Sequence, residues 1–498
     1  MGALFIAATM ARRGLLTPGR PVRIVRQFAA LGRWGFGLAG ELRQAAARSP
    51  ERIAVIDDDR TVTYAQLLAN AEVVAAGVTA GDRVGLLCRN SARMIEALIG
   101  ITSAGADPVL INTGLSAHQL RQVAKEQDLA ALIHDDEFAD RVAGLPGPPA
   151  GRGGTNTPPR RPGRTIVLTS GTTGTPKGAR RPTPGGFSPL CSVIDRIPLR
   201  AGDRVMIAAP LFHTWGFAGL QIALALRATI VLRRRFEPAE VVRALTGHRV
   251  QALIGVPVML QNLLDLPGPG YRGLRVAAVS GSALPGGLAT RFMDRYGDCL
   301  YNLYGSTEAS WVSIATPADL RDSPTTAGRP PHGTRVAVLG ADGRPVPDGD
   351  IGRIFVSNEM LFEGYTGQKN RSRTDGMLDT GDLGHRDRNG RLHVDGRADD
   401  MIVSGGENVF PAEVEDLLAA LPQVREVAVI GVPDADWGQR LAAYLVLRPG
   451  ETLSEDAVRE HVRHHRARFC VPKEVIFLPE LPRNPTGKIL ARELPRNG

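Results

Sequence analysis

Apolar, β-branched stretches alternate with helical patterns along most of this chain, up to about Gly305. The expected strands are 164–169, 205–209, 228–233, 250–256 and 274–280. Helical spacing occurs between them, for example at 239–246 and 287–296, and it also occurs earlier, at 61–78. Strands that alternate with helices are typical of parallel sheets covered by helices on both faces. The sequence therefore predicts an α/β fold.

The chain is too long for one compact core, and its pattern changes twice. A chain of 498 residues is expected to form at least two domains. After residue 327, short strands and turns predict a small β-subdomain, and near residue 397 a second α/β pattern begins. We expect an N-terminal extension at 1–49, a large domain at 50–396 and a small C-terminal domain at 397–498.

Two segments of the chain have a more particular pattern. Residues 144–163 hold six prolines and six glycines around three arginines, which predicts a disordered surface loop. In the C-terminal segment the expected helices are 411–420 and 454–466, and the expected strands are 424–431, 441–448 and 475–479.

Composition narrows the kind of partner. The chain has a formal net charge of +9, and its arginines are scattered along the sequence rather than grouped with aromatic residues. This argues against nucleic acid as a partner and suits anionic substrates such as ATP, carboxylates or coenzyme phosphates. The cysteines stand far apart, at 88, 191, 299 and 470, without metal-ligand spacing, which favours a reducing cytoplasm.

The N-terminal segment leaves two interpretations open. No apolar run reaches the length of a membrane span, and Arg12 and Arg13 follow the apolar residues 3–9, the wrong order for a secretory signal. Residues 20–42 mix arginines with apolar and aromatic residues. We favour a helix packed on the main body, and the alternative is a peripheral contact with the inner face of an anionic membrane.

A loop suited to phosphate groups follows the strand at 164–169. It reads TSGTTGTPKG and contains Thr169, Ser170, Gly171, Thr172, Thr173, Gly174 and Lys177. Glycines let backbone N–H groups approach an anion, hydroxyl groups add donors, and the lysine adds a positive charge. The spacing differs from the common P-loop, so a triphosphate bound by a different fold is predicted, whereas a plain polar turn is the alternative.

Further polar clusters end other apolar runs. Ser280-Gly281-Ser282-Ala283 offers a glycine against which a flat base can lie, and Tyr304-Gly305-Ser306-Thr307-Glu308 combines a ring, hydroxyls and a carboxylate. Asp379-Thr380-Gly381-Asp382 supplies carboxylates that can accept hydrogen bonds from ribose hydroxyls. Lys488, in the segment NPTGK, lies close to the end of the chain.

Together these motifs resemble the adenylate-forming superfamily, which includes acyl-CoA synthetases, peptide-synthetase adenylation domains and firefly-type luciferases. The resemblance covers about residues 50–492, and TSGTTGTPKG, YGSTE, TGD, GRADDMIVSGGENVFPAEVE and NPTGK occur in the family's order. It is strongest to bacterial fatty acyl-CoA ligases. It implies a large domain with α/β sheets and a small β-subdomain, followed by a small, mobile α+β domain.

The resemblance also implies roles for individual residues. The loop from Thr169 to Lys177 would hold the β- and γ-phosphates of ATP, Glu308 would bind Mg2+, and Thr307 would contact the α-phosphate. The adenine would be framed by Gly281, Ser282, Ala283, Asn302 and Tyr304. Asp382 and Arg397 would hold the ribose, and Lys488 would bridge the substrate carboxylate and the α-phosphate.

The second half-reaction, with CoA as the co-substrate, is implied to need a rotation of the small domain. The hinge would be Asp399, since a few residues can absorb such a backbone change. Ser404, Gly405 and Gly406 resemble the loop beside the tunnel for the pantetheine arm of CoA, although a plain tight turn competes with this interpretation.

The resemblance places the wall of the acyl pocket at residues 210–217. His213 stands where amino-acid-activating relatives carry an aspartate, so a buried ammonium group would lack a partner, and an α-amino acid is disfavoured. His213 would orient the carboxylate or close the thiol path, unless it is a core histidine. Trp215 would gate an apolar tunnel or simply pack in the core, and Val256 would add apolar lining. A medium- or long-chain fatty acid is expected.

Two rival functions are also compatible with the sequence. One is an acyl-AMP ligase that loads a carrier protein, although the insertion typical of such relatives is not evident between 305 and 397. The other is a non-catalytic acyl or nucleotide binder, against which Lys177, Glu308 and Lys488 argue.

Overall fold

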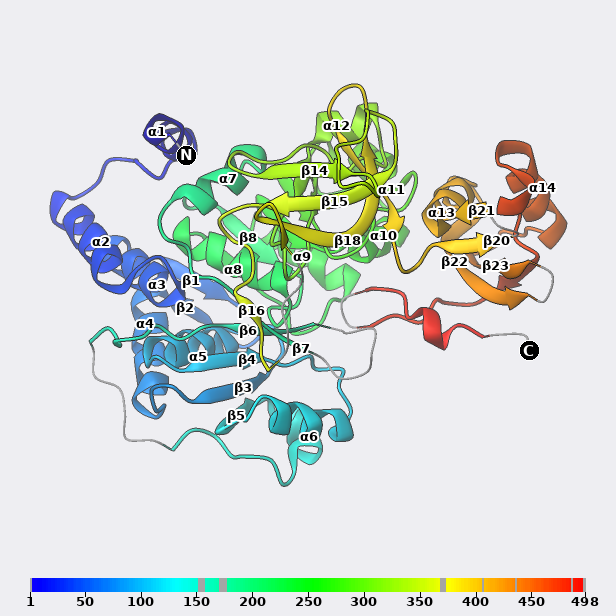
Figure 1. Ribbon diagram of the computed structural model, residues 1–498. Helices are drawn as coiled ribbons and strands as arrows, with labels where there is room; N and C mark the ends of the chain where they lie inside the picture. The colour runs from blue at the N-terminus through cyan, green and yellow to red at the C-terminus, as the bar shows by residue number, and fades with distance from the viewer. Residues whose placement is uncertain are drawn as a thin grey trace.

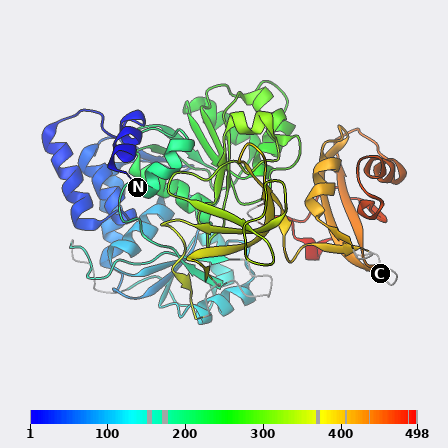
Figure 2. The same cartoon turned by 45° about the horizontal axis from the view of Figure 1, so that its top comes forward.

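The computed structural model describes residues 2–150, 157–169, 177–367, 373–404, 407–434, 437–484 and 487–495. Over these ranges the strands form four sheets. Three sheets belong to a large body, and the fourth lies in a smaller unit at the C-terminal end (Figure 1). Figure 2, turned by 45° from that view, also shows the N-terminal helices at the end of the molecule away from this smaller unit.

The first sheet has the strand order β13-β12-β11-β10-β8-β9-β1-β2, and the pairs from β12 to β1 are parallel. In that order the strands are Ser313–Ala315, Leu300–Tyr304, Val276–Val279, Ala252–Gly255, Arg204–Ile207, Thr229–Val231, Ile53–Ile56 and Thr61–Thr63. Side chains of β10 alternate between two cores: Ile254 packs in one and Leu253 in the other. The predicted α/β fold is confirmed.

Helices cover both faces of this sheet. The core around Ile254 includes residues of α3 (Leu38–Arg48) and α8 (Thr214–Ala225), and the core around Leu253 includes residues of α9 (Pro238–Gly247), α10 (Pro257–Asp265) and α11 (Leu288–Tyr296). Parallel strands buried on both faces explain the nearly continuous apolar runs in the sequence.

The second sheet has the order β16-β7-β6-β4-β3-β5. Its strands are Gly364–Tyr365, Lys177–Arg180, Ile166–Thr169, Asp107–Leu110, Arg83–Leu87 and Ala131–His134, and its associated helices are α4 (Tyr64–Ala76), α5 (Ala92–Ser103) and α6 (Ala117–Glu126). The helix expected at 61–78 is therefore too long at its start. Thr61–Thr63 pair with β1, and the Thr63 side chain caps α4 together with Gln66.

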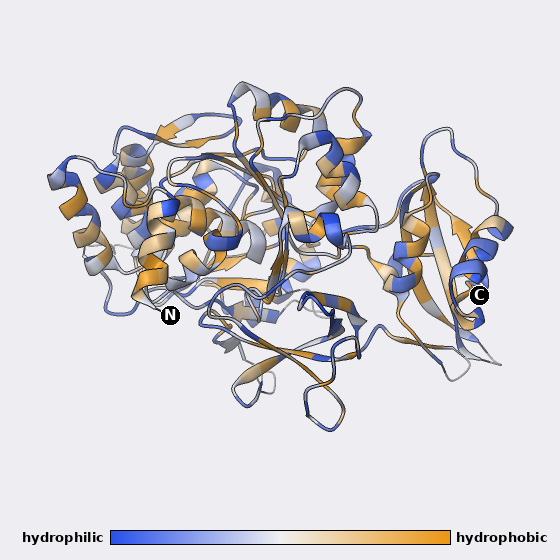
Figure 3. Cartoon of the chain, turned by 90° about the horizontal axis from the view of Figure 1, so that it is seen from above, coloured by the Kyte–Doolittle hydropathy of each residue, from blue (hydrophilic) through white to orange (hydrophobic). Residues whose placement is uncertain are grey.

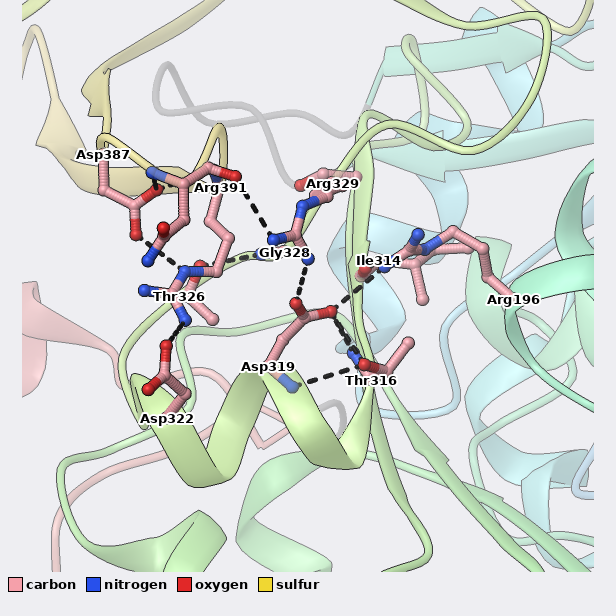
Figure 4. Close-up of polar contacts among 12 residues, drawn as sticks. Arg196, Ile314, Thr316, Asp319, Asp322, Thr326, Gly328, Arg329, Asp387 and Arg391 are labelled. Carbon is pink, nitrogen blue, oxygen red and sulfur yellow. Dashed lines mark hydrogen bonds and ion pairs between the residues drawn. The ribbon is translucent and has the colours of Figure 1, made fainter. Parts of the chain in front are cut away.

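The third sheet is the β-subdomain, with β14 (Arg335–Leu339), β15 (Gly352–Ser357), β18 (Met377–Arg386), β17 (Arg373–Thr374) and β19 (Leu392–Arg397) in antiparallel pairs. A polar network joins it to the first sheet (Figure 4). The buried Asp319, in α12 (Pro317–Asp322), accepts hydrogen bonds from Arg196 of α7 (Ser188–Arg196) and from Arg329. Arg391 bonds Asp387 and Asp322 in the same network.

The fourth sheet contains β21 (Glu407–Val409), β20 (Ile402–Ser404), β23 (Gly438–Leu447), β22 (Val424–Asp434) and β24 (Glu474–Phe477), with α13 (Pro411–Ala419) and α14 (Glu455–His465) packed on it. These elements match the helices and strands expected beyond residue 411, with β22 and β23 extended toward their hairpin turn. Figure 3 shows hydrophobic and hydrophilic residues alternating along both helices, as expected when one face packs on a sheet.

The N-terminal segment is helical, with α1 (Ala3–Arg12) and α2 (Pro21–Trp34) ahead of α3. Helix α2 packs on α3: the Arg43 guanidinium lies 3.5 Å from the centre of the Trp34 ring, and Gln27 donates to Gln44. Across the described residues, no helix is long and apolar enough to cross a bilayer. Of the loop expected at 144–163, residues 151–156 lie outside the described part, and the remainder forms neither helix nor strand.

Candidate active site

The polar clusters of the first sheet lie at one edge. Val256 follows β10, Gly281 follows β11 by two residues, Tyr304 ends β12, and His213 follows β8. Because these strands are parallel, their carboxyl ends meet at the same edge, where α/β folds commonly bind ligands.

The predicted phosphate loop connects the antiparallel strands β6 and β7. Thr169 pairs with Lys177 across the hairpin, and the Thr169 hydroxyl donates to the Lys177 carbonyl at 3.2 Å. Ser170, Gly171, Thr172, Thr173 and Gly174 lie outside the described residues. The base of the loop thus has Lys177 at one end and a hydroxyl at the other.

Glu308 lies close to this hairpin and has partners that the sequence did not indicate. The Tyr365 hydroxyl donates to its Oε1 at 2.6 Å, and the Lys177 Nζ is 5.9 Å from the centre of the Tyr365 ring. Buried Arg181, whose pKa is lowered by burial to about 10, donates to the Thr307 carbonyl and to the Ser310 hydroxyl. Tyr365 comes from β16, which reaches β7 only through tertiary pairing.

The chemistry of Glu308 fits Mg2+. Mg2+ prefers oxygen ligands and is commonly bound by one or two carboxylates together with substrate phosphates. The described residues contain no group of three or more His, Cys, Asp and Glu side chains that could hold a metal alone. A single carboxylate beside a phosphate loop therefore suits an ion that arrives with the nucleotide.

A second polar group joins the β-subdomain to β12. The Tyr304 hydroxyl donates to Asp382 Oδ2 at 2.5 Å, and burial is the main cause that raises the pKa of Tyr304 well above its usual value. Arg397 lies 3.6 Å from Asp382 Oδ1 and donates to Asp399 at 2.8 Å. Arg397 therefore connects Asp382 with the proposed hinge residue.

The other predicted adenine-site residues lie at the ends of β11 and β12. Gly281 has φ +100°, a conformation that favours glycine, and it exposes the backbone there. Ser282 is partly buried, Ala283 is exposed, and Asn302 is buried in β12.

The predicted acyl-pocket residues surround the start of α8. His213 is partly exposed, but its Nε2 is buried without a hydrogen-bond partner among the described residues, and desolvation lowers the pKa of His213 to about 4. The next residue, Thr214, has its hydroxyl 2.8 Å from that of Thr307. Trp215 donates from Nε1 to the Gly255 carbonyl at 3.0 Å, and it packs in the same core as Val256.

The loop of Lys488 reaches this edge from the small unit. Gly487, at φ +80°, packs against the side chain of Val258 at the start of α10, and the Lys488 amide donates to Asn484 at 2.9 Å. Lys488 itself is exposed. Arg425 holds the same unit to α10 through an ion pair of 2.9 Å with Asp265.

The loop predicted beside the CoA tunnel is described only in part. Ser404 is buried at the end of β20, and Gly405 and Gly406 lie outside the described residues.

Comparisons with known proteins agree with a large domain followed by a small C-terminal domain. A family profile for the AMP-binding enzyme matches residues 42–366, and a profile for the AMP-binding enzyme C-terminal domain matches residues 413–488. A feruloyl-CoA synthase of an Amycolatopsis species is 35% identical over 487 residues, which cover 92% of this chain and 99% of the relative. A 2-succinylbenzoate–CoA ligase of Bacillus subtilis is 30% identical over 91% of this chain and 96% of its own length.

Solved structures have a similar overall fold. The o-succinylbenzoate CoA synthetase of Bacillus subtilis, in complex with its acyl-adenylate intermediate, is 29% identical with a TM-score of 0.81, covering 92% of this chain and 98% of that one. ATP-bound MatB from Rhodopseudomonas palustris is 28% identical with a TM-score of 0.82, over 92% and 98% of the two chains.

The chain belongs to the AMP-binding enzyme family of adenylate-forming proteins. Within it, the chain is an AMP-forming acid–CoA ligase. ATP and CoA are its co-substrates, and Mg2+ is its metal ion. The relatives act on several kinds of acid, so the expectation of a fatty acid does not follow from the family.

Proposed function

We propose that this ligase activates a compact carboxylic acid with a flat, apolar acyl group, such as an aryl or arylalkanoic acid. A carboxylate oxygen attacks the α-phosphorus of ATP and pyrophosphate leaves, which gives an acyl-adenylate. The thiolate of CoA then attacks the acyl carbon and AMP leaves. The single observation that carries the choice of acid is the hydrogen bond from Trp215 to Gly255.

That hydrogen bond holds Trp215 as a wall instead of a gate. Its indole N–H is satisfied by a backbone carbonyl at the end of β10, and only 9% of the residue is exposed. Moving the ring aside for a long chain would leave a buried donor and acceptor unpaired, at a cost of about 1–3 kcal/mol for each group. A fixed wall favours a short, flat acyl group.

The charges around the wall favour an apolar group as well. His213 is neutral near pH 7 because burial holds its pKa at about 4. Trp215, Val256 and Met259 add only apolar side chains, so a second ionised group on the acid would find no partner among these residues. The names of the relatives include feruloyl-CoA synthase and indoleacetate–CoA ligase, which supports an aromatic acyl group.

The residue roles implied by the sequence are kept as proposals. Lys177, Thr169 and the remaining loop residues bind phosphates, Glu308 binds Mg2+, and Thr307 contacts the α-phosphate. Gly281, Ser282, Ala283, Asn302 and Tyr304 frame the adenine, and Asp382 and Arg397 hold the ribose. Lys488 bridges the two reacting groups, and Asp399 is the hinge between domains at 50–396 and 397–498. The packing of Gly487 against Val258 supports the placement of Lys488 at the acyl end of the site.

A medium- or long-chain fatty acid is the second candidate. The apolar character of Phe212, Phe217 and Val256, all buried in one core, favours it. It requires Trp215 to leave the Gly255 carbonyl.

The test is pyrophosphate release across a panel of acids, with and without CoA. We expect release with aryl and arylalkanoic acids, with thioester formed only when CoA is present. Preference for palmitate or decanoate would favour the second candidate, and acyl-adenylate that persists in the presence of CoA would favour transfer to a carrier protein.

A pair of variants tests the wall directly. Trp215→Ala is expected to shift the preference toward longer acids, whereas Trp311→Phe serves as the control. Trp311 also uses its indole N–H, in a bond to Thr334 at 2.9 Å, but it is not one of the residues proposed to line the pocket. An unchanged acid preference in Trp215→Ala would contradict its role as the wall.

A further inference from the structure

An open surface cavity of about 560 Å3 lies at the amino ends of the parallel strands of the first sheet, opposite the candidate active site. Its lining includes Arg52 just before β1, Gly202 just before β8, and Arg227 just before β9. These positions precede parallel strands, whereas the clusters of the active site follow them. The cavity is therefore separate from the site of adenylation.

The other wall of the cavity comes from the N-terminal segment. Residues from Gly14 to Arg23, in the connection between α1 and α2 and in the first turn of α2, line it on that side. Five arginines line the cavity, and Glu51 is the single acidic residue among its lining. We call this cavity the arginine pocket, and its arginines are Arg20, Arg23, Arg48, Arg52 and Arg227.

Glu51 does little to neutralise the arginine pocket. Both of its oxygens accept hydrogen bonds from Arg23, at 3.1 and 2.8 Å. One cation is thus already paired with the one anion, and four guanidinium groups remain without a carboxylate in the lining. Such an excess of one charge attracts anions.

Arg227 is the most informative member of the pocket. Only 7% of it is exposed, and its Nη1 has no hydrogen-bond partner among the described residues. Glu41 lies near enough to affect it, but burial raises the pKa of Glu41 to about 8, so this carboxyl is mostly neutral at pH 7. A buried guanidinium nitrogen without a hydrogen-bond partner is costly, and with the neutral Glu41 beside it this points to a missing anion.

Two glycines bring the other guanidinium groups close to the backbone. A Cβ on Gly19 would collide with the Arg48 guanidinium, and a Cβ on Gly202 would lie 2.9 Å from the Arg52 Nη1. Arg48 also donates to the Thr17 carbonyl at 2.9 Å. The donors around the cavity are therefore held in place by the loops that surround them.

We propose that the arginine pocket binds the phosphate group of a phosphate ester. Guanidinium groups are planar forks of N–H donors that match phosphate oxygens in pairs, and several of them compensate more than one negative charge. The ester is carried either by a soluble metabolite or by a phospholipid headgroup. The lipid source is relevant because Leu16, Val22 and Val25, in and beside the same connecting segment, are exposed apolar side chains.

The experiment uses the full chain and two probes. Glycerol 3-phosphate is titrated by calorimetry, and sedimentation is measured with phosphatidylcholine vesicles that contain or lack phosphatidylglycerol. The test variant is Arg48→Gln with Arg52→Gln, and the control is Arg26→Gln with Arg33→Gln, which removes equal charge from exposed positions of α2 outside the pocket. Neither pair touches the proposed catalytic residues.

Binding of glycerol 3-phosphate that is weakened at least about tenfold in the test variant, and retained in the control, supports the proposal with a soluble ligand. The same pattern with phosphatidylglycerol vesicles alone supports it with a lipid. No binding of either probe to the unaltered protein overturns it, and so does an equal loss in both variants, which would indicate general surface charge.

A single substitution keeps the test decisive if the double variant does not fold. Arg20 lines the pocket but is exposed, so Arg20→Gln is expected to leave the thermal unfolding midpoint unchanged. If the double variant fails to fold, weaker binding by Arg20→Gln supports the proposal, and unchanged binding overturns it.

Discussion

The Tyr365 hydroxyl donates a hydrogen bond of 2.6 Å to the carboxylate of Glu308. Tyr365 comes from β16 at the edge of the second sheet, and Glu308 follows β12 of the first sheet. The bond therefore fixes the proposed Mg2+ ligand from a different sheet.

Tyr365→Phe is expected to lower kcat/KM for pyrophosphate release by about threefold to tenfold, since one hydrogen bond that orients a reactive group is lost. The Mg2+ concentration for half-maximal rate should rise at the same time. The control is Tyr64→Phe, which removes a buried hydrogen bond of 2.6 Å to Ala228 remote from the site. Superimposable Mg2+ titrations of Tyr365→Phe and the unaltered enzyme would contradict the orienting role.

Lys488 is expected to matter for only one of the two half-reactions. Lys488→Ala should reduce adenylation at least about 100-fold, because it removes a positive charge where negative charge develops. Thioester formation from added acyl-adenylate and CoA should continue, because that step does not need the lysine in the site. Quenched-flow assays of each half-reaction measure both rates.

The matched control for Lys488 lies in the same unit. Lys473 pairs with Asp434 at 3.2 Å on the surface of the small C-terminal unit. Lys473→Ala should leave the rates of both half-reactions unchanged. If Lys488→Ala and Lys473→Ala adenylate at equal rates, the proposed role of Lys488 is wrong.

Local sequence pattern was enough to propose some residues of the candidate site, but not their tertiary partners. The strand at 164–169 was predicted, and a phosphate loop was expected after it because hydroxyl residues, glycines and a lysine follow this apolar run. The antiparallel pairing of β6 with β7 was not predicted. Tyr365 was not predicted either, because its role exists only where β16 pairs with β7 and places it beside Ala179. Trp215 was expected to gate the acyl tunnel or to pack in the core, and its indole could be seen as fixed only when β10 placed the Gly255 carbonyl beside it.

The error at 61–78 has a similar physical reason. Thr61–Thr63 lie next to a helix, and their apolar spacing merges with it in the sequence. Pairing with β1 and the capping box of Thr63 and Gln66 place the boundary at Tyr64. Helical periodicity does not mark the residue at which a β-branched strand gives way to a capped helix.

His213 makes the stability of the fold depend on pH. Its pKa is lowered to about 4 in the folded protein from 6.5, so below pH 6.5 the unfolded chain takes up a proton that the folded chain does not. The stability present above pH 6.5 is lost as the pH falls toward 4, and the loss at pH 5 is about 2 kcal/mol.

His213→Gln should remove this loss, since glutamine does not titrate. Urea unfolding at pH 7 and pH 5 should therefore show a smaller difference in free energy for His213→Gln than for the unaltered protein. His464→Gln, on an exposed residue of α14, should behave like the unaltered protein. Equal pH dependence of all three proteins would contradict a His213 that stays neutral in the folded protein.

Asp319 is expected to be a main contributor to the stability of the joint between the β-subdomain and the first sheet. It is 5% exposed and accepts hydrogen bonds from Arg196, Arg329 and Thr316 (Figure 4). Asp319→Asn removes the charge that both arginines share, and breaking a buried ion pair in this way costs about 3 kcal/mol. Denaturant unfolding should show this loss as a lower midpoint.

Asp294→Asn separates burial from the mere presence of an ion pair. Asp294 pairs with Arg321 at 2.6 Å, but its side chain is 63% exposed, so its loss should change the free energy of unfolding by less than about 1 kcal/mol. A comparable destabilisation by the two substitutions would mean that the network around Asp319 contributes no more than a surface pair. Both substitutions replace one carboxylate oxygen by an NH2 group and differ only in the environment of the side chain. A large difference in the free energy of unfolding would therefore assign the stability of this joint to the buried carboxylate.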